Sequence, residues 1–193
     1  IIGNTVFPAS KIKSIMRTKE KTLLRFLSSS DNYDPDKLEY DKQLITEFYN
    51  NNGYPEFKFT SSIAQLKTNT NNFEIILNIN EGDKFNFGEL EVESKLKKID
   101  PELVKTILPI KKGNLFDRSL LKESVEQLKE LAKSEGYSFI EIDTNLIDGS
   151  EANLVDVKLV INEGPRVYVN NINISGNTRT VDKVIRREVS LTE

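Results

Sequence analysis

Two stretches of sequence decide the fold, FEIILNINEGDKFNFGELEV at positions 73–92 and VDVKLVINEGPRVYVNNINI at positions 155–174. Each stretch opens with alternating apolar residues, reaches Glu-Gly, and continues into a second apolar pattern that changes phase halfway along. Alternation predicts β-strands, and the change of phase predicts a bulge. Because Glu81-Gly82 recurs as Glu163-Gly164, 82 positions later, we expect tandem copies of one small domain.

A second repeated signature marks the end of a helix in each copy. Asn52-Gly53-Tyr54 recurs 83 positions later as Glu135-Gly136-Tyr137, and each follows an amphipathic pattern that starts at Asp34 or at Asp117. Aspartate is a favoured N-cap, and glycine is the favoured residue for the left-handed position just after a helix. A shorter helix is predicted before each of these, beginning at Asp100-Pro101 in the second copy. The unit therefore reads β-α-α-β-β.

The predicted fold class is α+β, with each unit a three-stranded mixed sheet covered on one face by two helices. We expect one domain at residues 1–81 with its first strand truncated, a second at 82–163, and the start of a further domain at 164–193. Ile1-Ile2-Gly3-Asn4 resembles Ile174-Ser175-Gly176-Asn177, which follows a strand pattern. For this reason the first residues are expected to be the tail of a strand, and 164–193 to hold a first strand and helix only.

Composition argues against nucleic-acid binding and against the commonest catalytic groups. The 193 residues carry a net charge of −3, whereas nucleic-acid binding usually needs a clustered basic face. Cysteine and histidine are absent, which excludes disulfides and thiolate metal sites and removes the commonest general base. No apolar run approaches the ~20 residues of a transmembrane helix. An enzyme with carboxylate chemistry is the alternative that this composition leaves open.

The densest acidic stretch has two interpretations. Asp31, Asp34, Asp36, Glu39 and Asp41 lie close together and include the predicted helix start. Acidic residues are favoured at a helix N-terminus, and the stretch lacks the ligand spacing and mid-loop glycine of an EF-hand calcium loop. We therefore favour a helix start over a cation site, and we expect no metal, no cofactor and no catalytic set.

The order and spacing of the motifs resemble those of the POTRA family. The run from Glu163 to Asn177 resembles the start of the last POTRA domain in outer-membrane assembly factors of the BamA family, and the match extends over essentially all residues. It places the chain at the third and fourth domains and the start of the fifth. A longer inter-helix segment near Thr18 to Tyr33 favours this placement. Ser94-Lys95, where the other units have Gly-Asn, departs from the pattern.

This resemblance implies the periplasmic part of a Gram-negative outer-membrane protein, with a binding and assembly role and no enzymatic one. The implied partners are unfolded outer-membrane proteins, accessory assembly lipoproteins and the protein's own C-terminal membrane β-barrel. The alternative is the POTRA arm of a related translocase, either TamA-like, organellar or of the two-partner secretion type. Two-partner transporters have only two POTRA domains before the barrel, and the others match the spacing less well.

The first candidate site is the strand at residues 54–66, which should lie at the edge of its sheet. An edge strand offers unpaired N–H and C=O groups, to which an extended segment of any sequence can add. Phe57, Phe59 and Ile63 are expected to face the helices, and Lys58, Thr60 and Ser62 to face outward. The predicted binding residues are Phe57, Lys58, Phe59, Thr60, Ser61, Ser62 and Ile63. The alternatives are that Pro55 and Lys58 only protect the edge, or that two copies of the isolated chain pair edge to edge.

Two further candidates are an apolar patch and the joints between domains. The patch has four large apolar residues in five positions, and it forms either a docking surface or an extension of the first helix: Leu23, Leu24, Phe26 and Leu27. The joints leave almost no linker, which predicts restricted hinges at Glu81, Gly82, Glu163, Gly164 and Pro165.

Overall fold

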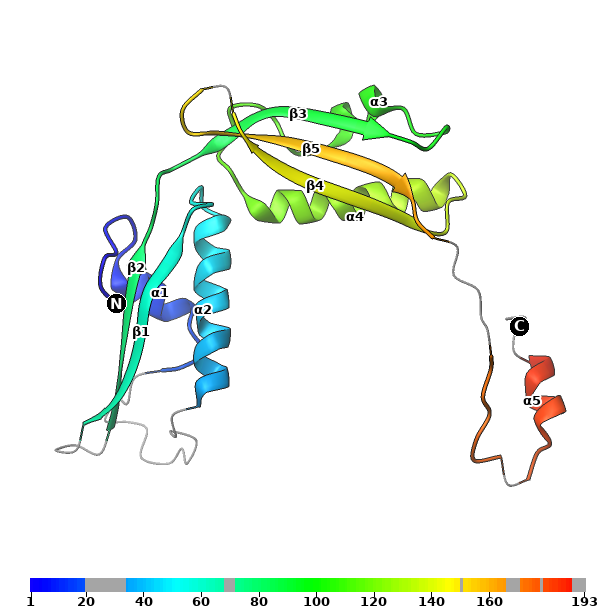
Figure 1. The fold of residues 1–193 in the computed structure, drawn as a ribbon, viewed down its shortest axis with the longest axis horizontal. Coiled ribbons are helices and arrows are strands. Elements are labelled where there is room, and N and C mark those ends of the chain that lie inside the picture. The colour runs from blue at the N-terminus through cyan, green and yellow to red at the C-terminus, as the bar shows by residue number, and fades with distance from the viewer. Residues whose placement is uncertain (20–33, 68–71, 150, 166–170, 178, 189–193) are drawn as a thin grey trace.

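The computed structural model describes residues 1–19, 34–67, 72–149, 151–165, 171–177 and 179–188 (Figure 1). The first unit contains α1 (Ala9–Ile15), α2 (Pro35–Asn50), β1 (Lys58–Lys67) and β2 (Asn72–Asn80). The second contains β3 (Asn86–Ser94), α3 (Pro101–Ile107), α4 (Arg118–Ser134), β4 (Ile140–Asp148) and β5 (Leu154–Glu163). A last helix, α5 (Asp182–Glu188), follows. This order confirms the α+β repeat.

The sheet of the second unit is three-stranded and mixed, as predicted. Its order is β3-β5-β4, and the central β5 runs parallel to β3 and antiparallel to β4. The register of β3 on β5 shifts between Phe87 and Leu90. This shift lies where the apolar pattern changes phase, so the bulge predicted from the alternation is present.

The first unit has the same arrangement with a very short first strand. β2 pairs antiparallel with β1 on one side, and on its other side Ile2 forms a parallel bridge to Asn78. The Ile2 N–H donates to the Leu77 carbonyl at 2.9 Å, and the Ile79 N–H donates to the Ile2 carbonyl at 3.0 Å. β2 is therefore the central strand, with β1 at one edge.

Each unit has its own core between the helices and one sheet face. Figure 1 shows α2 lying along the β1–β2 hairpin and α4 lying along the sheet of the second unit. Fully buried side chains in the first core come from both helices and from β2, for example Ile12, Ile45, Tyr49 and Leu77. In the second core they include Phe87, Val104, Leu128 and Leu159.

The helix ends follow the predicted capping chemistry. The Asp34 side chain accepts the Asp36 N–H at 3.0 Å, and the Asp117 side chain accepts the Ser119 N–H at 2.8 Å. Gly53 and Gly136 have φ of +94° and +92°, which are left-handed values that favour glycine. The repeated Gly-Tyr signature is therefore a helix end in both units.

Beyond β5 the structure departs from the expected strand. The predicted strand from Val167 to Ile174 lies partly outside the described residues, and the described residues 171–177 form no strand. The helix expected after it is present as α5.

Candidate functional site

The candidate edge strand β1 borders its sheet on one side only. It pairs with β2 over nine residue positions, from Lys58 opposite Asn80 to Lys67 opposite Asn72. Within the described part of the chain no strand pairs with its other side. The backbone groups that point away from β2 are therefore the ones that an added strand would use.

A bulge at Thr60 changes which side chains of β1 face the helices. The register passes from Phe59 opposite Ile79 to Ser61 opposite Asn78, so Thr60 is the extra residue. Beyond it, Ser62 lies opposite the buried Leu77 on the helix side. The expectation that Ile63 faces the helices and Ser62 faces outward is therefore wrong.

The corrected register places an apolar pair on the open face of the first sheet. Ile63 lies opposite Ile76, and directly opposed side chains of an antiparallel pair point to the same face. Ile63 is 48% exposed. Unbroken alternation from Phe57 to Ile63 gave the wrong face because a bulge reverses the parity of every residue after it.

A cluster of aromatic rings supports the start of β1. Tyr49 of α2 stacks on Phe57 with ring centroids 4.1 Å apart, and Phe57 meets Phe59 edge to face at 5.2 Å. The cluster also includes Phe7, Phe48 and Tyr54. Pairs of this kind each contribute about 0.5–1.5 kcal/mol beyond the area they bury. The packed rings therefore fix the position of the residues at the start of β1.

Lysines lie at both ends of β1. Lys58 is exposed at the start, and Lys67 at the far end pairs with Glu74 of β2 at 2.8 Å. Hydrogen bonds from Lys67 and then from Gln65 hold the pKa of Glu74 below its usual range. Charged ends limit uncontrolled pairing of an edge, but they leave the middle of the strand accessible.

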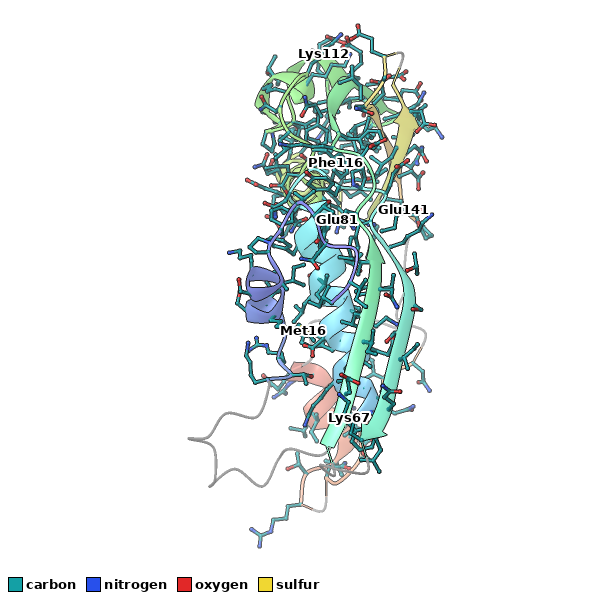
Figure 2. All side chains as sticks on the ribbon, turned by 90° about the vertical axis from the view of Figure 1, so that its left-hand side faces the viewer. Met16, Lys67, Glu81, Lys112, Phe116 and Glu141 are labelled. Atoms are coloured by element: carbon teal, nitrogen blue, oxygen red, sulfur yellow. The ribbon has the colours of Figure 1, made fainter. Side chains whose placement is uncertain are left out.

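The structure shows a buried carboxylate, Glu81, that sequence reasoning placed in a hinge. Glu81 follows β2 and is only 6% exposed. It accepts the Tyr49 hydroxyl at 2.7 Å, the Thr5 hydroxyl and N–H at 2.5 and 2.7 Å, and the Val6 N–H at 3.0 Å. Figure 2 shows Glu81 and Lys67 at opposite ends of the hairpin.

Glu81 ties three segments of the first unit together as an anion. Burial opposes its charge, but the hydrogen bonds from Thr5, Tyr49 and Val6 outweigh burial and lower its pKa. Burial, followed by the bond to Glu81, raises the pKa of Tyr49, which therefore stays a hydrogen-bond donor. The sequence offered one signal, since the second unit has Ala132 where the first has Tyr49 in an apolar stripe.

The other predicted joint residues lie where each unit ends. Gly82 has φ +70°, and a Cβ there would lie 2.8 Å from the Glu56 Cβ. Glu163 is the exposed last residue of β5, and Gly164 and Pro165 follow it. The Gly164 N–H donates to the Phe139 carbonyl at 3.0 Å. The hinge role of these residues stays a prediction.

The predicted docking patch of Leu23, Leu24, Phe26 and Leu27 lies outside the described residues, as does the acidic Asp31, and the role of the patch stays a prediction.

Two residues of the acidic stretch have structural roles. Asp34 caps α2, and the buried Asp41 accepts the Thr18 N–H at 3.1 Å. The described residues contain no group of three or more His, Cys, Asp or Glu side chains that could hold a metal ion. Among the helices that the structure describes, none is long and apolar enough to cross a bilayer.

Comparison with known proteins gives the same family in sequence and in structure. The chain is 28% identical over 187 residues to the outer membrane protein assembly factor BamA of Neisseria meningitidis serogroup B, covering 97% of the chain and 24% of that protein. It is 29% identical over 191 residues to BamA of Neorickettsia risticii, covering 99% of the chain and 26% of that protein. The chain thus spans about a quarter of the length of these relatives.

A solved structure and a family profile agree with these relatives. The crystal structure of Haemophilus influenzae BamA POTRA3-5 aligns with all of the chain and 75% of that structure, with a TM-score of 0.74 and 20% identity. The POTRA profile, described as surface antigen variable number repeat, matches residues 1–82 and again 85–164. The chain therefore belongs to the POTRA family.

Proposed function

We propose that the chain is a periplasmic binding and scaffold module of an outer-membrane protein assembly insertase. It receives unfolded β-barrel precursors by strand addition to β1 and docks accessory lipoproteins, with no catalytic step of its own. A membrane β-barrel in the same protein completes the insertase. The names of the two relatives, both outer membrane protein assembly factors, support this assignment.

The observation that carries the proposal is the open side of β1. A substrate added there bonds to backbone groups, so its sequence matters little, which suits a partner that must accept many different precursors. The aromatic base of Tyr49, Phe57 and Phe59 holds the strand in place before a substrate arrives. The residues of β1 then lose less conformational freedom when a substrate binds, which favours affinity. Ile63 and Ile76 add an apolar surface for alternate side chains of the incoming strand.

Proline substitution in the middle of β1 tests the proposal. Successive N–H groups of a strand point alternately to its two sides, so of Ile63→Pro and Ala64→Pro one removes an outward N–H and the other removes a bond to β2. Circular dichroism and thermal melting identify the variant that keeps the fold. The probe is an extended peptide with alternating apolar and polar residues, as in an outer-membrane strand. Binding is measured from amide shifts of β1 by NMR.

The folded proline variant is expected to lose the peptide-induced shifts. Its matched control is Thr144→Pro, or Asn145→Pro where the first fails to fold, in β4 at the edge of the second unit. A peptide N-methylated at alternate positions should bind weakly to the parent, because it lacks the donors that pair with β1. Parent-like binding by the folded variant would show that precursors do not add to β1.

A further inference from the structure

The two units meet at the turn that ends α2. The Phe85 N–H donates to the Gly53 carbonyl at 2.8 Å. A Cβ on Gly53 would lie 2.5 Å from Leu115 Cδ1, so the Leu115 side chain rests directly on the glycine backbone. Leu115 belongs to the connection before α4, and it bridges to Asn86 at the start of β3. A side chain at position 53 would prevent Leu115 from packing against the backbone there.

An ion pair accompanies the seated leucine. Lys122 of α4 meets Glu47, near the end of α2, at 2.7 Å between Nζ and Oε1. The first unit thus offers a glycine turn with an anion six positions before it. The second unit supplies an apolar side chain and a cation from the region around the start of its longer helix.

The second unit repeats the receiving half of this junction at its own far end. Gly136 corresponds to Gly53 and Glu130 to Glu47, each 83 positions later. Gly136 has the same left-handed φ, and among the described residues a Cβ there would meet only Lys98 Nζ, at 3.9 Å. Beside it lies an open pocket of about 480 Å³, whose lining includes Glu130, Lys133, Tyr137, Phe139, Gly164 and Pro165.

We infer that this pocket, with Gly136 at its side, is a socket for the POTRA unit to which α5 belongs, through the part of that unit that continues beyond α5 in the longer protein. The segment that enters it is the connection before that unit's longer helix, which places an apolar side chain on Gly136. A cation from the first turns of the same helix pairs with Glu130. This contact is independent of strand addition to β1, and it fixes the angle between the second unit and the next.

A following unit of the same family is the occupant that the repeat and the solved relative support. The Haemophilus influenzae structure contains three POTRA domains, and the chain covers 75% of it. Leu115 and Lys122 lie in the part of the repeat that, 82 positions on, falls beyond residue 193. Exposed Phe139, at 44%, gives the socket an apolar wall. Its rim carries the carboxylates of Glu130 and Glu141 beside Lys129 and Lys133, and the 74% exposed Glu130 side chain lies 3.9 Å from the Lys133 ammonium, a weak pairing that a cation of the next unit would replace. An apolar residue flanked by a cation is complementary to both.

The experiment measures a distance across the second junction in the protein extended through the next complete unit. The described chain has no cysteine, so Thr106→Cys in α3 and Lys183→Cys in α5 can carry nitroxide labels for electron–electron double resonance. Glu130→Lys reverses the rim charge, and Phe139→Ser removes the apolar wall. Glu102→Lys is the matched control, because Glu102 is also an exposed carboxylate with a local lysine partner, Lys105.

The parent is expected to show one narrow distance peak. Glu130→Lys and Phe139→Ser should each lose that peak to a broad distribution, and Glu102→Lys should keep it. The inference is overturned if Glu130→Lys and Phe139→Ser each keep a narrow peak identical to the parent's. It is also overturned if the Glu102→Lys control broadens as much as these two variants. A distance that changes with protein concentration would mean that a second copy occupies the socket, which also overturns it.

Discussion

Removing the hydroxyl of Tyr49 is expected to weaken the first unit through Glu81. Tyr49→Phe keeps the ring, so its stacking on Phe57 at 4.1 Å is preserved. The substitution deletes the 2.7 Å hydrogen bond to Glu81, a carboxylate that is only 6% exposed. The lost donor cannot be replaced easily by water at such low exposure, and the charge remains in the site.

The magnitude follows from the number of donors that remain. A hydrogen bond to a charged group contributes about 1.5–3 kcal/mol. Glu81 keeps the donors of Thr5 and Val6, so the lower half of this range applies. We expect the free energy of unfolding of the first unit to fall by about 1.5–2 kcal/mol, roughly a 10- to 30-fold change in its unfolding constant.

The assay is urea unfolding followed by circular dichroism, with amide exchange at Ile12 and Leu77 used to assign the loss to the first core. Tyr40→Phe is the control, because Tyr40 lies in the same helix and is 47% exposed. The expected change for the control is within about 0.5 kcal/mol. If Tyr49→Phe falls in the same range, the buried carboxylate does not hold the unit together in the way its contacts indicate.

The junction and the buried carboxylate give three further tests. Lys122→Glu should widen the range of angles between the two units that residual dipolar couplings report. Adding Glu47→Lys reverses the ion pair and should restore the parent's narrow range, and a double variant that does not recover would contradict a specific ion pair. Gly53→Ala should lower the urea midpoint more than Gly113→Ala, since both have positive φ but only Gly53 has an atom of the next unit within 4 Å of its Cβ position. Glu81 has a lowered folded pKa, so its stabilisation is present above the unfolded pKa and lost as pH falls through the folded one. The parent should therefore lose more stability than Glu81→Gln on titration from about pH 7 to about pH 3, and parallel curves would contradict this.

Local signals in the sequence were sufficient for the repeat and the element order. Gly53 and Gly136 were predictable as helix ends, because a left-handed residue after an amphipathic run favours glycine in any context. The bulge at Thr60 was not predictable, since the polar run Thr60-Ser61-Ser62 contains no apolar residue whose change of phase would mark the extra position. The contacts of Glu81 were not predictable for a different reason: its partner Thr5 is 76 positions away, and no local pattern records such a contact.

The turn that joins the units lies shortly before the candidate binding strand, so under the proposed function the geometry of the arm affects how a substrate is received. From Gly53, on which Leu115 rests, the chain reaches β1 within five residues. Two backbone hydrogen bonds restrain those residues. The Tyr54 N–H donates to the Tyr49 carbonyl at 3.0 Å, and the Phe57 N–H donates to the Tyr54 carbonyl at 3.3 Å. Tyr49 also carries the bond to Glu81. Because few backbone torsions are free between Gly53 and β1, a change of the angle between the two units must rotate β1 together with the rest of the first unit. The orientation in which a precursor strand is received would then be set by the docking of successive units, and the socket beside Gly136 would extend that control along the arm.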